Sequence, residues 1–289
     1  MEVIVARSAG FCFGVEKAVK MVYDQLGKGK EIYTFGPIIH NDEVVRDLES
    51  RGVKVVEGAE DLKKIKSGTI VIRSHGVSRD IYELIREQGL ECVDATCPFV
   101  KRIHHTVEKE CGLGRKIIIV GNPGHPEVEG IRGWVSGTEA VVVESEEEAE
   151  RLADRDSGSF FKAAEICIVA QTTFNYNKFK DIVEIFLKRG YNVSVVNTIC
   201  NATEERQAEA RQIASQAAVM IVIGGTHSSN TRKLYEICKE ECEDTHFIQT
   251  LDDLRLELPK AVSPVGITAG ASTPNNIIEE VQNYVRINF

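Results

Sequence analysis

Three of the eight cysteines stand at equivalent places in a unit that the chain repeats three times: Cys12, Cys97 and Cys200. The repeat is also marked by a glycine that opens a polar loop 24 residues after each cysteine: Gly36, Gly121 and Gly224. Each cysteine comes just before an expected helix, where free N–H groups and the helix dipole favour the thiolate over the thiol. Because thiolates bind metals, the three equivalent cysteines predict one metal site.

The spacing of the cysteines narrows the kind of metal. The sequence has no C-x2-C pair, which excludes a four-cysteine zinc ribbon and a ferredoxin-type run. Three thiolates without a fourth of matching position favour a [4Fe–4S] cluster with one open iron, and zinc held by three cysteines is the alternative. Cys92 is expected on a strand, with its side chain in the hydrophobic core. The remaining cysteines have no counterpart in the repeat and no predicted role: Cys111, Cys167, Cys238 and Cys242.

Polar loops recur at two other places in the repeat. Imidazole, hydroxyl and amide groups stand there in the candidate substrate-binding residues His40, His75, His125, Thr172, Ser228, Ser229, Asn230 and Ser272. All of these groups can donate hydrogen bonds to phosphate oxygens, and the segment from Ser228 to Asn230 is expected at a helix N-terminus. The set predicts a diphosphate site. The alternative is that the serine, threonine and asparagine residues only cap helices.

Glu127 is the candidate catalytic acid. It lies two residues beyond His125 and has no basic neighbour in the sequence that would keep it ionised. A carboxyl group in a closed cavity has a raised pKa and can deliver a proton near neutral pH. Asp42 holds the matching position after His40, and a solvated loop carboxylate is the alternative interpretation of Glu127.

The elements that position these residues are short β-branched runs alternating with amphipathic helices. Strands that are apolar along their whole length predict parallel sheets covered by helices on both faces, so the fold class is α/β. The cysteines are 85 and 103 residues apart, which suggests three small lobes related by a pseudo-threefold axis in a trefoil around a central cluster. The predicted lobes are residues 13–91, residues 92–193, and residues 194–289 together with 1–12.

All nine polar or cysteine loops follow expected strands. In parallel α/β sheets ligands gather outside the carboxyl ends of the strands, so we expect these loops to face one central cavity.

Composition limits the class of protein. The chain has 289 residues, of which 43% are hydrophobic and 27% charged, as in ordinary globular proteins. Its net charge is −9, whereas proteins that bind nucleic acids usually carry an excess of basic residues. The apolar runs are too short to span a bilayer and the N-terminus lacks a signal pattern, which predicts a cytoplasmic protein without a disulfide framework.

Eight motifs in this order resemble one family over essentially the whole chain: GFCFGVEKAV, GPIIHN, RSHGV, DATCPFV, GNPGHPEVEG, QTTF, NTICNATEERQ and SSNT. The family is that of the 4-hydroxy-3-methylbut-2-enyl diphosphate reductases, iron–sulfur enzymes of the methylerythritol phosphate route to isoprenoids. The resemblance implies reductive loss of the substrate's allylic hydroxyl as water, giving isopentenyl and dimethylallyl diphosphates.

The resemblance also implies roles for single residues. Cys12, Cys97 and Cys200 would hold the [4Fe–4S] cluster, Glu127 would donate the proton, and Thr172 would lie near the substrate hydroxyl. The diphosphate would be bound by His40, His75, His125, Ser228, Ser229, Asn230 and Ser272. A ferredoxin or flavodoxin would deliver the two electrons to a monomer. His227 departs from the family pattern, which commonly has Asn before SSN.

Two rival functions stay open on the sequence. A redox-neutral [4Fe–4S] dehydratase or a quinolinate-synthase-like enzyme can also use three cysteines in a threefold body. A zinc-stabilised binding module without catalysis is the rival of another class.

Overall fold

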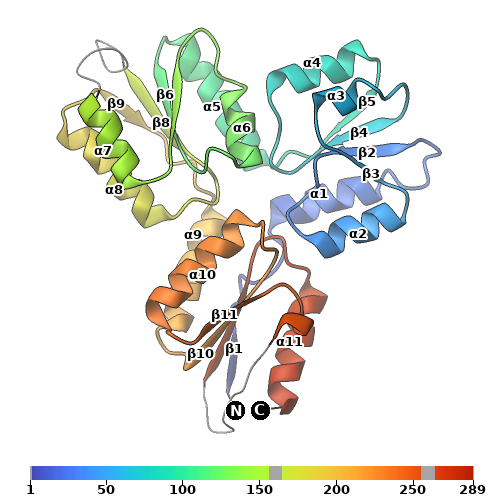
Figure 1. Cartoon of the computed structure of the whole chain (residues 1–289), viewed down its shortest axis with the longest axis vertical. Helices are drawn as coiled ribbons and strands as arrows, with labels where there is room; N and C mark the ends of the chain where they lie inside the picture. The colour runs from blue at the N-terminus through green and yellow to red at the C-terminus, as the bar shows by residue number, and fades with distance from the viewer. Residues whose placement is uncertain (1, 156–164, 255–263, 289) are drawn as a thin grey trace. The chain divides into compact units, whose positions relative to one another are not determined.

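The structure is a computed structural model that describes residues 2–155, 165–254 and 264–288. Within these residues it contains three four-stranded sheets, and every strand pair in them is parallel. Helices alternate with the strands along the chain (Figure 1). The predicted α/β fold with three small lobes and parallel sheets is therefore confirmed.

The first sheet has the strand order β3-β2-β4-β5. Its strands are β2 (Ile32–Phe35), β3 (Lys54–Val56), β4 (Thr69–Ile72) and β5 (Glu91–Asp94). The helices in this part of the chain are α1 (Phe13–Tyr23), α2 (Asp42–Ser50), α3 (Ala59–Leu62) and α4 (Arg79–Glu87).

The second sheet has the equivalent order β7-β6-β8-β9. Its strands are β6 (Lys116–Val120), β7 (Ala140–Val143), β8 (Ile166–Ala170) and β9 (Val193–Val195). Its helices are α5 (Pro98–Gly112), α6 (Pro126–Arg132), α7 (Glu146–Arg155) and α8 (Tyr176–Lys188).

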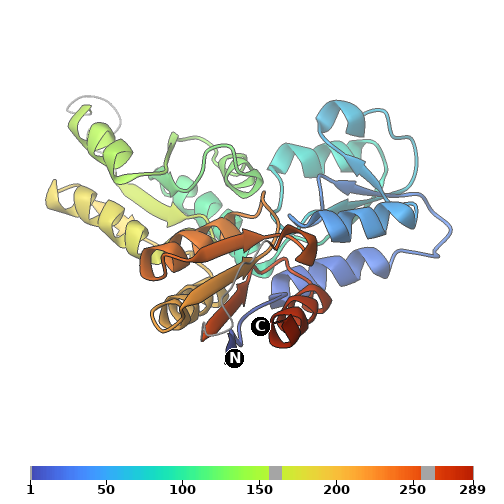
Figure 2. The ribbon, with the colours of Figure 1, turned by 60° about the horizontal axis from the view of Figure 1, so that its bottom comes forward.

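The third sheet has the order β1-β12-β10-β11 and joins the two ends of the chain. Its strands are β1 (Val3–Val5), β10 (Val219–Ile223), β11 (Thr245–Ile248) and β12 (Val265–Ala269). Its helices are α9 (Asn201–Ala214), α10 (Ser229–Glu241), the 3₁₀ helix η1 (Leu251–Asp253) and α11 (Asn275–Asn288). Blue β1 lies beside red α11 in both ribbon views (Figure 2).

The central strands are apolar throughout because helices cover both faces of each sheet. In β6, Ile118 and Val120 pack with α7 and α8, whereas Ile117 and Ile119 pack with α5 and α6. The third sheet is covered in the same way, by α9 and α10 on one face and α11 on the other (Figure 1). Burial on both faces removes the alternation of apolar and polar residues that a half-exposed strand shows.

The contacts divide the chain into two compact units. Unit 1 comprises Met1–Glu16, Ile39–Asp47 and Cys200–Phe289, and it contains the third sheet. Unit 2 comprises Lys17–Ile38 and Leu48–Ile199, and it contains the first and second sheets. The predicted lobe boundaries stay a prediction, and β5, which pairs with β4, lies across the boundary placed at residues 91 and 92.

Cys92 corrects one expectation from the sequence. It was expected in the core, but its side chain is exposed. The reason is that β5 is one of the two edge strands of the first sheet, and a residue on an edge strand has fewer neighbours than one on a central strand.

No helix within the described residues is long and apolar enough to cross a lipid bilayer.

Candidate active site

Every predicted site loop leaves the carboxyl end of a strand. The loops of the cysteines follow β1, β5 and β9, those of the histidines follow β2, β4 and β6, and those of Thr172, Ser228 and Ser272 follow β8, β10 and β12. The strands place all nine at the edge where parallel α/β sheets bind ligands.

The predicted site residues are divided between the two units. Unit 1 holds Cys12, His40, Cys200, Ser228, Ser229, Asn230 and Ser272, and unit 2 holds His75, Cys97, His125, Glu127 and Thr172.

The three equivalent cysteines each stand immediately before a helix, as predicted. Phe13 begins α1 directly after Cys12, and Cys97 and Cys200 are the N-caps of α5 and α9. Neither of these two thiols makes the hydrogen bond of an N-cap side chain, and all three cysteines are partly exposed. Four other cysteines are buried: Cys111, Cys167, Cys238 and Cys242. Only the trio therefore combines access with a position at a helix N-terminus, which suits thiolate ligands.

Glu127 in unit 2 is a buried carboxyl group with two hydrogen bonds. Its side chain is only 2% exposed, in the first turn of α6. Oε1 accepts a hydrogen bond from the backbone N–H of Thr172 at 2.6 Å, and Oε2 accepts one from the Thr172 hydroxyl at 2.8 Å. The contact joins the loop after β6 to the loop after β8, as expected for two residues at one site.

Burial sets the acidity of Glu127. It raises the pKa of Glu127 to about 7, and the two hydrogen bonds from Thr172 only partly oppose this rise. No basic side chain contributes to the pKa, in agreement with the sequence around this residue. The group can therefore carry a proton at neutral pH and release it to a substrate.

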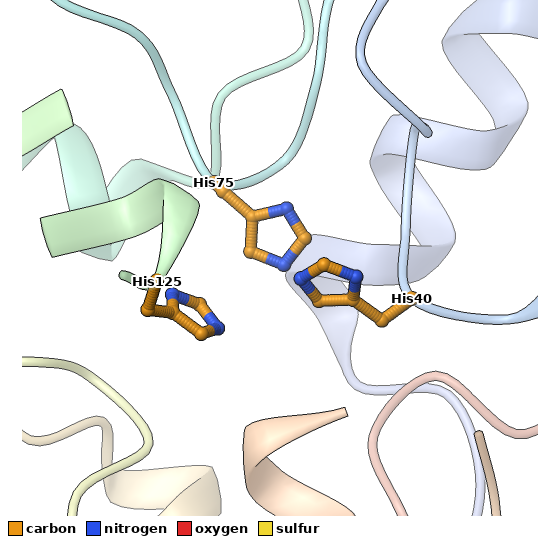
Figure 3. Close-up of side chains that lie close together, drawn as sticks. All are labelled: His40, His75 and His125. Atoms are coloured by element: carbon orange, nitrogen blue, oxygen red, sulfur yellow. The ribbon is translucent and has the colours of Figure 1, made fainter. Parts of the chain in front are cut away.

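His75 and His125 lie side by side in unit 2. Their ring centroids are 5.5 Å apart and their planes meet at 78° (Figure 3). His125 is the N-cap of α6, and its Nδ1 accepts a hydrogen bond from the backbone N–H of Glu127 at 3.1 Å. With Nδ1 as an acceptor, the proton of the neutral ring resides on Nε2, where it can be donated to an anion.

Cys97 is tied to the loop that carries His75. Its backbone N–H donates to the carbonyl oxygen of Ser74 at 2.9 Å. Gly76 in the same loop has φ of +72°, and a Cβ there would lie 2.6 Å from the ring of His104. The conformation and the close contact both require glycine, which explains the RSHG motif.

Three loops meet in unit 1. The hydroxyl of Ser272 donates to the carbonyl oxygen of His40 at 3.1 Å. A Cβ on Gly225 would lie 2.6 Å from that same oxygen, so the glycine loop after β10 passes directly against the His40 loop. The predicted diphosphate ligands of this unit thus come from loops that are in contact with one another.

The N-terminus of α10 holds two serines and a buried amide group. Ser228 is its N-cap and accepts a hydrogen bond from the N–H of Thr231 at 3.3 Å, and Ser229 is its first residue. Asn230 is 4% exposed, and among the described residues neither its side-chain oxygen nor its nitrogen has a hydrogen-bond partner. A buried amide without partners is costly, so its presence at a helix N-terminus favours a bound anion. His227, the departure from the family pattern, is exposed.

The sequence did not predict a role for Arg206. This residue of α9 is 3% exposed and donates hydrogen bonds to backbone carbonyls of the loop that leads to Cys12. The contact spans almost 200 residues of sequence, and the repeat shows no equivalent arginine after Cys12 or Cys97. No pattern in the sequence marks Arg206 as a site residue.

Comparisons with known proteins agree with this arrangement. The family model described as LytB protein matches residues 3–286. A 4-hydroxy-3-methylbut-2-enyl diphosphate reductase of Caldanaerobacter subterraneus subsp. tengcongensis is 45% identical over 283 residues, covering 97% of this chain and 95% of the relative. The enzyme of the same name from Alkaliphilus oremlandii is also 45% identical and covers 97% and 98% of the two chains.

Solved structures lead to the same family. A structure of (E)-4-hydroxy-3-methyl-but-2-enyl diphosphate reductase, described as the terminal enzyme of the non-mevalonate pathway, has a TM-score of 0.71 at 42% identity and covers 99% of both chains. The E-1-hydroxy-2-methyl-but-2-enyl-4-diphosphate reductase of Plasmodium falciparum has a TM-score of 0.89 at 27% identity and covers 98% of this chain and 87% of its own. The chain therefore belongs to the LytB protein family.

Proposed function

We propose that this protein reduces (E)-4-hydroxy-3-methylbut-2-enyl diphosphate to isopentenyl and dimethylallyl diphosphates in the non-mevalonate route to isoprenoids. The reaction takes up two electrons and two protons and releases the allylic hydroxyl group as water. Relatives of this name that align along nearly the whole chain support the assignment. The observation that carries it is Glu127, a buried carboxyl group that is protonated near neutral pH at the edge of the second sheet.

The cofactor is an iron–sulfur cluster, as in other enzymes of the LytB family. We assign Cys12, Cys97 and Cys200 as the ligands of a [4Fe–4S] cluster. Their chemistry fits, since each is a partly exposed thiol at a helix N-terminus, where a thiolate is stabilised. When bound, the cluster supplies electrons and a Lewis-acidic iron.

The proton chemistry belongs to Glu127 and Thr172. Loss of hydroxide is difficult, and protonation of the leaving oxygen by a buried acid makes water the leaving group. The hydroxyl and N–H of Thr172 hold both carboxyl oxygens of Glu127, which fixes the direction in which the acid can deliver its proton. In this role Thr172 lies beside the allylic end of the substrate.

The diphosphate is bound by neutral donors. The proposed donors are the hydroxyl, amide and imidazole groups of His40, His75, His125, Ser228, Ser229, Asn230 and Ser272. A protein with a net charge of −9 repels a diphosphate at long range, so binding depends on donors aimed at close range. The unpaired amide of Asn230 and the Nε2 proton of His125 are suited to this.

The electrons come from a one-electron carrier, which we assign as a ferredoxin or flavodoxin. Two successive single-electron transfers supply the two electrons of the reaction.

The decisive experiment uses the anaerobically purified protein. We expect a brown protein with iron and acid-labile sulfide in equal amounts, which oxidises reduced viologen only when the diphosphate substrate is added. Iron without viologen oxidation would favour a redox-neutral dehydratase, and a colourless zinc protein would favour a binding module. Mössbauer spectra with and without substrate should differ at one iron site only.

A further inference from the structure

Arg206 is a buried cation at the side of the Cys12 loop in unit 1. Its Nε donates to the carbonyl oxygen of Ser8 at 2.8 Å, and its Nη2 donates to the same oxygen and, at 2.8 Å, to the carbonyl oxygen of Gly10. Burial lowers the pKa of Arg206, but guanidinium starts so far above neutrality that it stays charged. A permanent cation therefore binds the carbonyl of Gly10, which is two residues before Cys12 in the sequence.

Glu209 holds the other side of the same loop. It lies one turn after Arg206 on α9 and accepts hydrogen bonds from the N–H groups of Arg7 and Ser8, both at 2.9 Å. The hydroxyl of Ser8 donates to it as well, at 2.5 Å. Arg206 binds the carbonyls and Glu209 binds the N–H groups, so the two side chains clamp residues 7–10 to the helix. We call this pair the α9 clamp.

The α9 clamp connects two predicted cluster ligands. Cys200 is the N-cap of α9, and the clamped loop leads directly into Cys12. Gly10 has φ of +98°, and a Cβ there would lie 2.4 Å from Oδ1 of Asn275, so the loop passes close against the start of α11 and needs glycine at this position. The two ligands are 188 positions apart in the chain but are fixed to one helix.

Charge gives Arg206 a second effect. Both Cys12 and Cys200 act electrostatically on it, and each raises its pKa, as Glu209 does. Arg206 lies on the helix that Cys200 caps, and it binds the loop that leads into Cys12, so its positive charge lies near both thiols. A buried cation stabilises an anionic cofactor more as that cofactor becomes more negative, and thereby favours its reduction.

We propose that Arg206 and Glu209 are positioning residues that fix Cys12 relative to Cys200, and that the charge of Arg206 also raises the reduction potential of the cofactor. The proposal rests on the iron–sulfur site assigned above. Arg206 has two effects in this proposal. Its hydrogen bonds help to retain the iron, and its charge raises the reduction potential.

The test compares four variants of the anaerobically purified protein by iron loss to a chelator and by EPR-monitored redox titration. Arg206→Met removes both the hydrogen bonds and the charge. We expect iron loss to be about 10-fold to 100-fold faster, since losing a group that holds a metal ligand in place usually weakens metal binding by that factor. We also expect a tenfold lower ratio of reduced to oxidised cluster at a fixed potential, which is about 59 mV for one electron.

The conservative variants separate the two contributions. Arg206→Lys keeps the charge but cannot bridge both carbonyls, so it should lose iron quickly and yet restore the potential. Glu209→Gln removes part of the clamp without removing the cation, so it should lose iron faster with no fall in potential. Arg211→Met is the matched control, because Arg211 lies on the same helix and forms ion pairs with Glu240 and Glu241 at the surface.

The experiment distinguishes an error in the role of Arg206 from an error in the proposed function of the protein. If the wild-type protein carries no iron, the proposed function is wrong. If the wild-type protein carries the cluster and Arg206→Met keeps its iron and its potential, only the role of Arg206 is wrong. Far-UV circular dichroism checks the fold of each variant, and if Arg206→Met does not fold, the lysine and glutamine variants decide between the same outcomes.

Discussion

At the scale of single residues, the proposed chemistry depends on a carboxyl group whose surroundings are almost entirely uncharged. Burial raises the pKa of Glu127 to about 7 against two hydrogen bonds from Thr172, which favour the ionised form. The same residue pair thus sets both the direction and the acidity of the proton donor. The presence of the acidic proton and its pKa can each be changed by a single substitution, at Glu127 or at Thr172.

Glu127→Gln removes the acidic proton and keeps the shape of the side chain. We expect the rate of substrate reduction to fall about 10²-fold to 10⁴-fold, the usual contribution of a general acid, with iron content and substrate affinity retained. Viologen oxidation measures the rate, iron analysis measures the iron content, and calorimetric titration measures the affinity for the substrate. Near-normal turnover would remove Glu127 from the mechanism.

The pH dependence tests the assignment in a different way. Because the protonated form of Glu127 is the active one, kcat should fall as pH rises through about 7. The hydroxyl of Thr172 lowers the pKa of Glu127, so Thr172→Val should raise it and move this limb of the profile to higher pH. A limb that stays in place or moves to lower pH contradicts the proton assignment. The profile of Glu127→Gln, which lacks the group, is the control.

Residue identities were predictable where the repeat marks them. The equivalent positions of Cys12, Cys97 and Cys200 predicted their place before a helix, which the structure confirms. The same reasoning could not find Arg206, because its partners are backbone carbonyls almost 200 residues away and any loop could supply them. It also placed Cys92 in the core because an apolar strand pattern does not show which strand forms the edge.

At the scale of elements, a residue at a helix N-terminus can serve the helix, a ligand or both. Ser228 caps α10 and is also a proposed diphosphate ligand, whereas Ser145 makes the same kind of bond at the start of α7 without any proposed ligand role. In both cases the hydroxyl accepts from the N–H three residues later, at 3.3 Å. The two serines therefore form a matched pair for separating capping from binding.

Replacing each serine with alanine should cost about 1 kcal/mol of stability, the usual value of an N-cap side chain. Only Ser228→Ala should also raise KM for the diphosphate substrate, since it alone removes a proposed ligand. Chemical denaturation and steady-state kinetics measure the two effects. Equal KM values for the two variants would mean that Ser228 only caps its helix.

The elements themselves were the most predictable part of the fold. The strand runs IYTF, KIIIV, AVVV, ICIVA and VMIVI occupy the observed strands β2, β6, β7, β8 and β10 without a shift. Continuous apolar strands predicted burial on both faces, and the packing of β6 between two pairs of helices explains why that inference holds. In the structure β1 pairs with β12, so both ends of the chain contribute to the third sheet.

At the scale of the whole molecule, one contact in unit 2 joins its two sheets and was not predicted from any sequence motif. Trp134, the only tryptophan, follows α6 of the second sheet and donates from Nε1 to the carbonyl oxygen of Val77 at 2.9 Å. Its ring is stacked on His104 at 5.0 Å, and the guanidinium of Arg79 lies 5.1 Å above it. Gly133 leaves no room for a side chain, because a Cβ there would lie 2.0 Å from that of Ser78.

This contact joins the two loops that carry proposed ligands. Val77 follows His75 by two residues, and α6 begins next to His125, so Trp134 bridges the loop of one histidine to the helix that starts at the other. The sequence could not predict it, because the repeat describes each lobe separately and contains no information about which lobes touch. The consequence is that a residue outside the site should control how accurately the two imidazoles are placed.

Trp134→Phe tests this consequence. Phenylalanine keeps an aromatic ring but leaves the Val77 carbonyl without its donor, which should cost about 1–3 kcal/mol of stability. If the contact positions His75 and His125, KM for the diphosphate should rise while the cluster content stays constant. Tyr235→Phe is the control, since it also keeps a ring, stacked on Phe247, and lies in unit 1. A loss of stability with an unchanged KM would show that Trp134 joins the two sheets without placing the histidines.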